Sequence, residues 1–118
     1  MDAEPLPRKM YIELIEAGVI EVTLHFMGGS DEGYLSVDFV RAENASELPT
    51  EKRRALYDAI EEWAERAYEY SGAGDGSDYG DDIRYNLRDN TVTTQEWYHV
   101  RQYDNEATTP LSIEGKDE

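Results

Sequence analysis

The residues of this sequence most able to do chemistry are carboxylates gathered in residues 55–83. That stretch holds nine acids and one base, Arg66, a balance of 1 − 9 = −8. Carboxylates can give hard oxygen ligands to a cation, or negative charge to the Arg and Lys side chains of a partner. The candidate partner-binding acids are Asp58, Glu61, Glu62, Glu65, Glu69, Asp75, Asp78, Asp81 and Asp82.

One row of these acids has helical spacing. At about 100° per residue, four of them stack within about 60° on one helix face: Asp58, Glu62, Glu65 and Glu69. Like charges at this spacing repel, and acids near a helix C-terminus oppose its dipole, so the row costs stability. It predicts a mimic of nucleic acid that occupies phosphate-binding Arg and Lys sites. The alternative is the solvated face of an amphipathic helix.

Charge density limits the mimic hypothesis. Four charges over about 16 Å of helix are fewer than the roughly nine that duplex DNA carries in that length. The Asp-rich residues 75–82 would therefore have to add to the helix.

The same Asp-rich residues are also a candidate site for a divalent cation, Ca²⁺ in particular. Aligned with an EF-hand loop from Asp75, Gly80 takes the sixth position correctly. Tyr79 stands at the fifth position and Asn86 at the twelfth, where oxygen ligands belong. A calcium-binding accessory module is the alternative function, with four ligands: Asp75, Asp78, Asp81 and Asp82.

Candidate catalytic residues are few, because the chain has two His and no Cys. His25 and His99 fall in expected strands beside polar or aromatic neighbours, which is typical of surface or packing histidines. A hydrolase would need a pocket joining one of them to a carboxylate. We expect no enzyme and no cofactor. Tyr79 and Trp97 join the candidate binding residues, since aromatic side chains are enriched at interfaces.

The whole chain has 118 residues, with 27 acidic and 11 basic side chains and a net charge of −16. This acidity argues against direct binding to nucleic acid or an anionic membrane. It favours a basic partner such as a nuclease or a CRISPR-Cas subunit. The alternative is that the acidity only keeps the protein soluble or reflects a salt-adapted host. The absence of Cys and of long apolar runs predicts a cytoplasmic protein.

Hydrophobic periodicity predicts the elements that position these residues. Residues 6–17 and 50–70 have helical spacing, and Gly18 can form a left-handed end to the first helix. Alternation predicts strands over residues 19–27, 35–40, 83–88 and 92–103, with a bulge between Thr94 and Trp97. Asp89 and Asn90 can take both positive-φ positions of a hairpin turn. Residues 71–82 are expected to form a loop.

These elements predict an α+β fold in two layers, in the order helix, hairpin, helix, hairpin. A four-stranded, mainly antiparallel sheet is expected to be covered on one face by the two helices. The length fits one domain. It would span residues 1–103, followed by a flexible tail at 104–118.

The run from Leu14 to Thr23, with Phe26 and the loop to Gly33, resembles an uncharacterised family of small bacterial, plasmid and phage proteins. Members have an Ala-Gly-Val/Ile start, a strand and a Gly-Asp-Ser-Gly-like loop; here residues 29–33 read Gly-Ser-Asp-Glu-Gly, with Glu in place of Ser. The resemblance covers about residues 10–101. It implies an α+β fold and a mobile-element setting, and no catalytic residue. In composition the chain is also similar to phage inhibitors of host defence, including anti-CRISPR and anti-restriction proteins.

Overall fold

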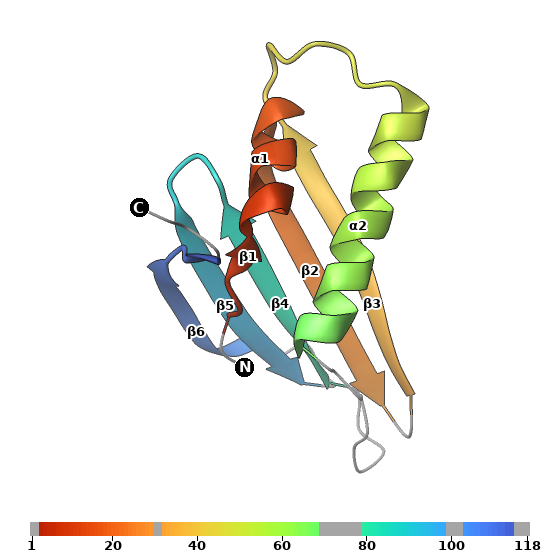
Figure 1. Cartoon of the computed structure of the whole chain (residues 1–118). Helices are drawn as coiled ribbons and strands as arrows, with labels where there is room; N and C mark the ends of the chain where they lie inside the picture. Colours follow the sequence, from red (N-terminus) through yellow and green to blue (C-terminus); the bar gives the residue numbers. More distant parts are fainter. Residues whose placement is uncertain (1–2, 30–31, 69–78, 99–102, 115–118) are drawn as a thin grey trace.

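Five antiparallel strands in the order β3-β2-β4-β5-β6 form the main sheet of the protein, seen here in a computed structural model (Figure 1). The structure describes residues 3–29, 32–68, 79–98 and 103–114. A second, two-stranded sheet pairs β1 with β7 in parallel. The elements are β1 (Leu6–Pro7), α1 (Arg8–Glu16), β2 (Val19–Gly29), β3 (Glu32–Arg41), α2 (Thr50–Tyr68), β4 (Tyr79–Asn86), β5 (Thr91–Tyr98), β6 (Tyr103–Pro110) and β7 (Ile113–Glu114).

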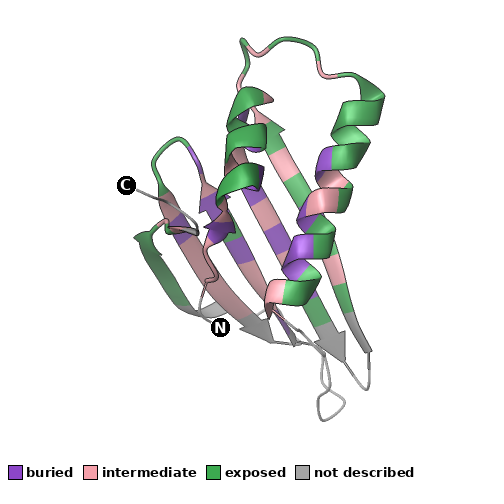
Figure 2. Ribbon diagram, viewed as in Figure 1, coloured by how far each residue is buried: buried purple, intermediate pink, exposed green. Residues whose placement is uncertain are grey.

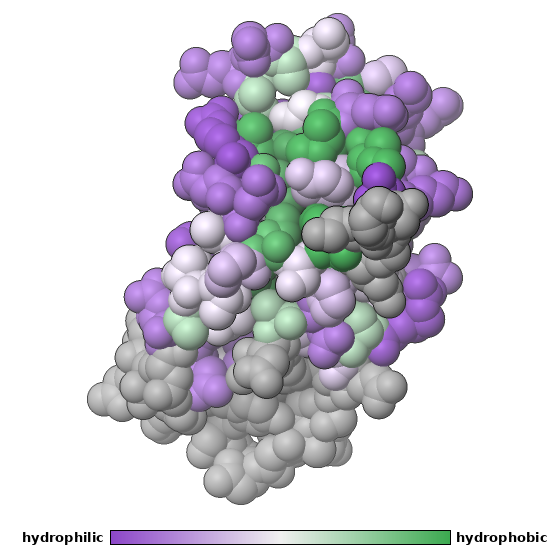
Figure 3. Space-filling model, turned by 60° about the vertical axis from the view of Figure 1, so that its left-hand side comes forward, coloured by the Kyte–Doolittle hydropathy of each residue, from purple (hydrophilic) through white to green (hydrophobic). Residues whose placement is uncertain are grey.

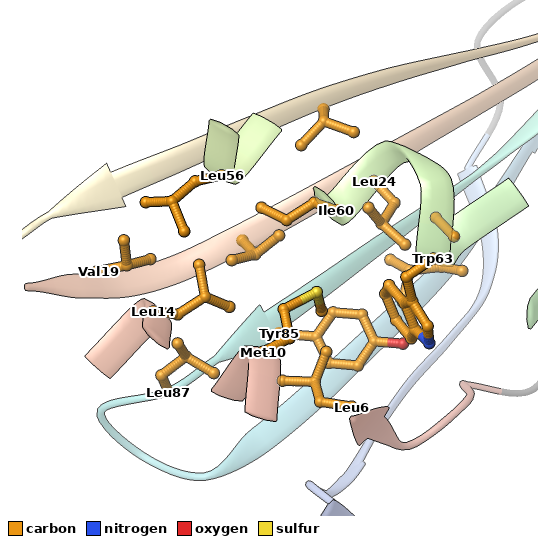
Figure 4. Packing of buried hydrophobic residues seen from close by; sticks show 14 of the residues in the cluster. Leu6, Met10, Leu14, Val19, Leu24, Leu56, Ile60, Trp63, Tyr85 and Leu87 are labelled. Atoms are coloured by element: carbon orange, nitrogen blue, oxygen red, sulfur yellow. The ribbon is translucent and has the colours of Figure 1, made fainter. Parts of the chain in front are cut away.

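Both helices lie on the same face of the five-stranded sheet, and the buried residues lie between the two layers (Figures 1 and 2). Alternate residues of β2 supply that face, because Val22, Leu24 and Phe26 are buried as their spacing predicts. The side chains of Trp63 in α2 and Tyr85 in β4 meet edge to face, with ring centroids 5.8 Å apart (Figure 4). Each buried large apolar side chain stabilises the fold by roughly 1.5–3 kcal/mol.

The predicted α+β class is confirmed, but the expected count of four strands is wrong. The sequence predicts one last strand to about Tyr103 and a tail from residue 104, whereas β6 occupies Tyr103–Pro110 and β7 follows it. This segment has a polar sequence with weak alternation. It is held by its ladder with β5, across which the Thr93 and Thr108 hydroxyls lie 2.9 Å apart.

Strand β4 begins inside the segment expected to be a loop. Tyr79, Gly80, Asp81 and Asp82 all belong to it. Gly and Asp disfavour strands intrinsically. Here they pair with β2 on one side and β5 on the other, so the ladders override that preference.

Two local predictions are confirmed and one is wrong. Gly18 has a φ of 80°, so it forms the left-handed end of α1. The register of β5 against β6 shifts between Thr94 and Glu96, where a bulge is expected. In the β4–β5 turn, however, Asn90 has a φ of 59° and Asp89 does not have a positive φ. The amide of Asp89 instead donates to Oδ1 of Asn86 at 2.9 Å, which fixes the turn from its start.

Helix α1 is shorter than expected and buries a narrower stripe. Leu6 pairs with Ile113 in the small sheet, so the helix begins at Arg8. Met10 and Leu14 are buried, whereas Ile12 and Ile15 are 42% and 44% exposed. Figure 3 shows apolar atoms gathered in the upper half of this side of the molecule, between hydrophilic flanks. Neither helix in the described residues is long and apolar enough to cross a membrane.

Candidate functional site

The outer face of α2 carries the predicted row of acids. Figure 2 shows this face exposed along the helix, while Leu56, Ile60 and Trp63 are buried against the sheet. This apolar stripe holds the helix against the sheet, so the backbone that carries the acids is held in place. The described members of the row, Asp58, Glu62 and Glu65, are all exposed, and so is Glu61 beside them.

Two exposed bases lie beside this row within the described residues, Arg54 one turn before Asp58 and Arg66 one turn after Glu62. Arg66 lies 3.5 Å from Glu62, but the two side chains are 68% and 76% exposed, and such surface pairs contribute little. Arg53, in the first turn, lies over the Phe39 ring of β3 at 5.6 Å and so is directed away from the row. Apart from Glu51 in the first turn and Arg66 in the last, the bases of α2 lie near its N-terminus and the acids further on, which opposes the helix dipole.

The structure does not bring both predicted Asp residues of β4 to this surface. Asp82 is opposite His25 in the ladder, and Asp81 is opposite Phe26. Since neighbouring strand residues point to opposite faces, Asp81 lies on the helix-covered face and Asp82 on the open one. The expectation of one surface formed by the helix and both Asp residues is therefore wrong. The same alternation keeps the two side chains from sharing one cation.

The other predicted site residues lie wholly or partly outside the described residues. Glu69, Asp75 and Asp78 are outside them. Tyr79 and Trp97 are placed by their backbones in β4 and β5, and their side chains are outside the description. Across residues 3–29, 32–68, 79–98 and 103–114, no group of three His, Cys, Asp or Glu side chains could hold a metal ion.

The surroundings of Asp81 disfavour a charged carboxylate. Glu96 is directly opposite it on β5. Burial raises the pKa of the Asp81 carboxyl above its ordinary value, and the charges of Glu96 and Asp82 raise it further. Because the pKa is raised in the folded state, folding is favoured while Asp81 is protonated, and this contribution is lost as the pH rises through that pKa.

Replacing Asp81 with Asn is therefore expected to stabilise the protein at neutral pH. Removing one charge of a directly opposed pair should give roughly 0.2–1 kcal/mol, measured by urea unfolding. The gain should shrink as the pH falls toward the ordinary value of 3.8, where the wild-type carboxyl is protonated too. Asp82→Asn is the matched control, since it removes a carboxylate 3.0 Å from His25 and should not stabilise. An equal gain from both variants would contradict the role of Asp81.

His25 lies on the open face of the sheet between two carboxylates. Its Nδ1 is 3.0 Å from Oδ1 of Asp82, and its Nε2 is 3.3 Å from Oδ2 of Asp38. The three residues come from β4, β2 and β3, so the contacts bridge three adjacent strands. Both ring nitrogens of His25 therefore face carboxylates.

A groove that the sequence does not predict lies between the C-terminal end of α1 and the N-terminal half of α2. It has a volume of about 670 Å³, and the connection from β3 to α2 forms one side of it. That connection, residues 42–49, has the composition of a polar linker. Its path depends on contacts far apart in the sequence, so no local pattern indicates the groove.

Arg41 fixes this connection against the end of α1. Its Nε donates to the carbonyl of Ala17 at 2.8 Å, and its Nη2 donates to the carbonyl of Ser46. The amide of Ala42 also donates to the carbonyl of Gly18 at 2.8 Å. The wall of the groove is thus formed by hydrogen-bonded backbone.

Comparison of the chain with protein-family models, curated proteins and solved structures finds no match. The resemblance over residues 10–101 therefore stays a prediction.

Proposed function

We propose that the exposed acidic face of α2 binds a basic protein, one whose Arg and Lys side chains otherwise contact nucleic acid. The observation that carries this is a set of four exposed acids, on a helix whose opposite side is buried: Asp58, Glu62 and Glu65 of the row, and Glu61 beside them. Holding like charges together costs stability. A partner with Arg side chains would offset that cost through charge-assisted hydrogen bonds.

The size of the row sets the kind of contact. Asp58 and Glu65 are seven residues apart along the helix, or roughly 10 Å at about 1.5 Å per residue. Duplex DNA carries about six charges in that length, against four here. We therefore propose a partner that offers a compact basic patch or helix, rather than a groove that holds a whole duplex. An inhibitor that covers part of a nuclease or of a CRISPR-Cas subunit would act in this way.

Charge reversal on α2 tests the proposal. The variant Asp58→Lys/Glu62→Lys/Glu65→Lys should bind a labelled Arg-rich helical peptide about tenfold more weakly than wild type, from three pairs at roughly 0.5 kcal/mol each. Fluorescence anisotropy at two salt concentrations measures the change, and salt should weaken wild-type binding more.

The matched control makes the same change of net charge elsewhere. Asp38→Lys/Asp89→Lys/Glu106→Lys alters three exposed acids outside α2 and outside the connection from β3 to α2, so both variants go from −16 to −10. This control should lose less than about threefold in affinity, since long-range attraction is screened by salt. Equal losses in the two variants would show that only net charge matters, and the α2 proposal would then be wrong.

A further inference from the structure

The groove beside α2 has the dimensions of a binding site. Its volume of about 670 Å³ lies within the range of roughly 300–1,000 Å³ that ligand pockets occupy. Its apolar lining includes Ile15, Leu48 and Leu56, from α1, the β3–α2 connection and α2. Ile15 is 44% exposed, so its apolar side chain is open to solvent there, whereas Leu56 is buried.

The groove is preformed rather than dependent on a ligand to shape it. Arg41 holds both the end of α1 and the connection through backbone carbonyls. At the same corner, a Cβ added to Gly18 would lie only 2.7 Å from the Cβ of Ala45, which shows how closely the connection approaches α1. A preformed site loses less entropy on binding, which favours affinity.

The charges that line the groove select the chemistry of its occupant. Three exposed acids line it: Glu13, Glu16 and Glu47. Of its two bases, Arg41 turns its donors onto carbonyls of the protein, which leaves Lys52 as the exposed one. The surroundings of the apolar surface are therefore acidic, and they complement a segment that carries basic side chains beside an apolar one.

The groove is also continuous with the acidic row. Ala55 lines the groove and is exposed on α2. At about 100° per residue, Glu62 lies within about 20° of Ala55 around the helix, and Asp58 within about 60°. One partner segment can therefore run from the groove along the row.

We infer that the groove is an anchor site for an apolar side chain of a basic, amphipathic segment of a partner protein. This rests on the proposed function, which it deepens by naming the partner's chemistry. The acidic row attracts the segment and contacts its basic side chains, and the groove takes up its apolar side chain. The attraction between charges and the burial of the apolar side chain contribute separately to the affinity for the partner.

Three labelled peptides separate them. The first has Leu along one face of a helix and Lys on the other, the second replaces every Leu with Gln, and the third replaces every Lys with Glu. The first should bind about tenfold more tightly than the second, as burial of one large apolar side chain predicts. The third should not bind. Amide NMR shifts from the first peptide should concentrate at Ala45, Leu48 and Ala55.

A pair of variants on α1 supplies the matched control. Ile15 and Ile12 are similarly exposed, and Ile15 lines the groove whereas Ile12 does not. Ile15→Gln should lower the affinity for the first peptide, with Leu and Lys faces, about threefold to tenfold. Ile12→Gln should lower it by less than about twofold.

The outcomes distinguish this inference from the function on which it rests. Equal binding of the first two peptides, or equal effects of the Ile12 and Ile15 variants, would overturn the anchor site and leave the acidic row standing. Shifts confined to the open face of the sheet would overturn the anchor site as well. No binding of either basic peptide would overturn both proposals.

Discussion

Replacing Gly18 with Ala is expected to destabilise the protein by roughly 2–5 kcal/mol. The left-handed backbone contributes about 1–2 kcal/mol of this loss, and a steric overlap contributes about 1–3 kcal/mol. The φ of Gly18 is 80°, a conformation that residues with a Cβ rarely adopt. The new Cβ would also lie 2.7 Å from the Cβ of Ala45. Urea unfolding followed by circular dichroism measures the loss.

A double variant separates the two causes. Ala45→Gly removes the atom that the new Cβ would meet, so Gly18→Ala should cost less in that background. Asn keeps the steric overlap but tolerates a left-handed backbone better than Ala. The free energy of unfolding of Gly18→Asn should therefore lie between those of wild type and Gly18→Ala. A cost below about 0.5 kcal/mol for Gly18→Ala would contradict the tight corner, and with it the preformed groove wall.

Long, strongly periodic segments were predictable from the sequence. Val22, Leu24 and Phe26 alternate with polar residues, and they are buried on the covered face of β2. The spacing of Leu56, Ile60 and Trp63 likewise gives the buried side of α2, and hence its exposed acidic side. Both patterns are local and regular, so they need no tertiary information.

Features that depend on distant partners were not predictable. Strand β6 is polar, and its ladder with β5 places it. Asp81 and Asp82 were expected in a loop, where both could face one partner. In β4 they point to opposite sides, because the β2 ladder extends to Tyr79. Ile15 fits the helical stripe by spacing alone, yet it stays exposed beside a groove whose wall Arg41 fixes from another element.

A partly buried ring of hydrogen bonds ties the N-terminal segment to the two layers. The amide of Glu4 donates to the Tyr68 hydroxyl at 2.8 Å, and the Tyr85 hydroxyl donates to the Glu4 carbonyl at 2.7 Å. The two hydroxyl oxygens lie 2.5 Å apart. Because the proton of Tyr85 goes to Glu4, Tyr68 donates to Tyr85 and closes the ring. The segment leading into β1 is thereby joined to the end of α2 and to β4.

Removing one hydroxyl of this ring should lower the free energy of unfolding by more than the loss of a single hydrogen bond would. Tyr85→Phe leaves the Glu4 carbonyl without its donor and the Tyr68 hydroxyl without its acceptor, at a side chain with no exposed surface. The expected loss of unfolding free energy is roughly 1–3 kcal/mol. Tyr57→Phe keeps the ring whose centroid lies 4.6 Å from that of Phe39, so it is the control and should change stability by less than about 0.5 kcal/mol.

The same ring predicts the response of the protein to alkali. Burial raises the pKa of Tyr85 far above its ordinary value of 10.0, and it raises the pKa of Tyr68 as well. Above pH 10 the unfolded chain loses these protons while the folded chain keeps them, so the stability present below that pH falls as the pH rises. The melting temperature should therefore decline above pH 10, and less steeply in Tyr85→Phe, from its lower starting value. Tyrosinate absorbance should show the phenols of Tyr68 and Tyr85 ionising only as the protein unfolds, and their ionisation in the folded state would refute the hydrogen-bonded ring.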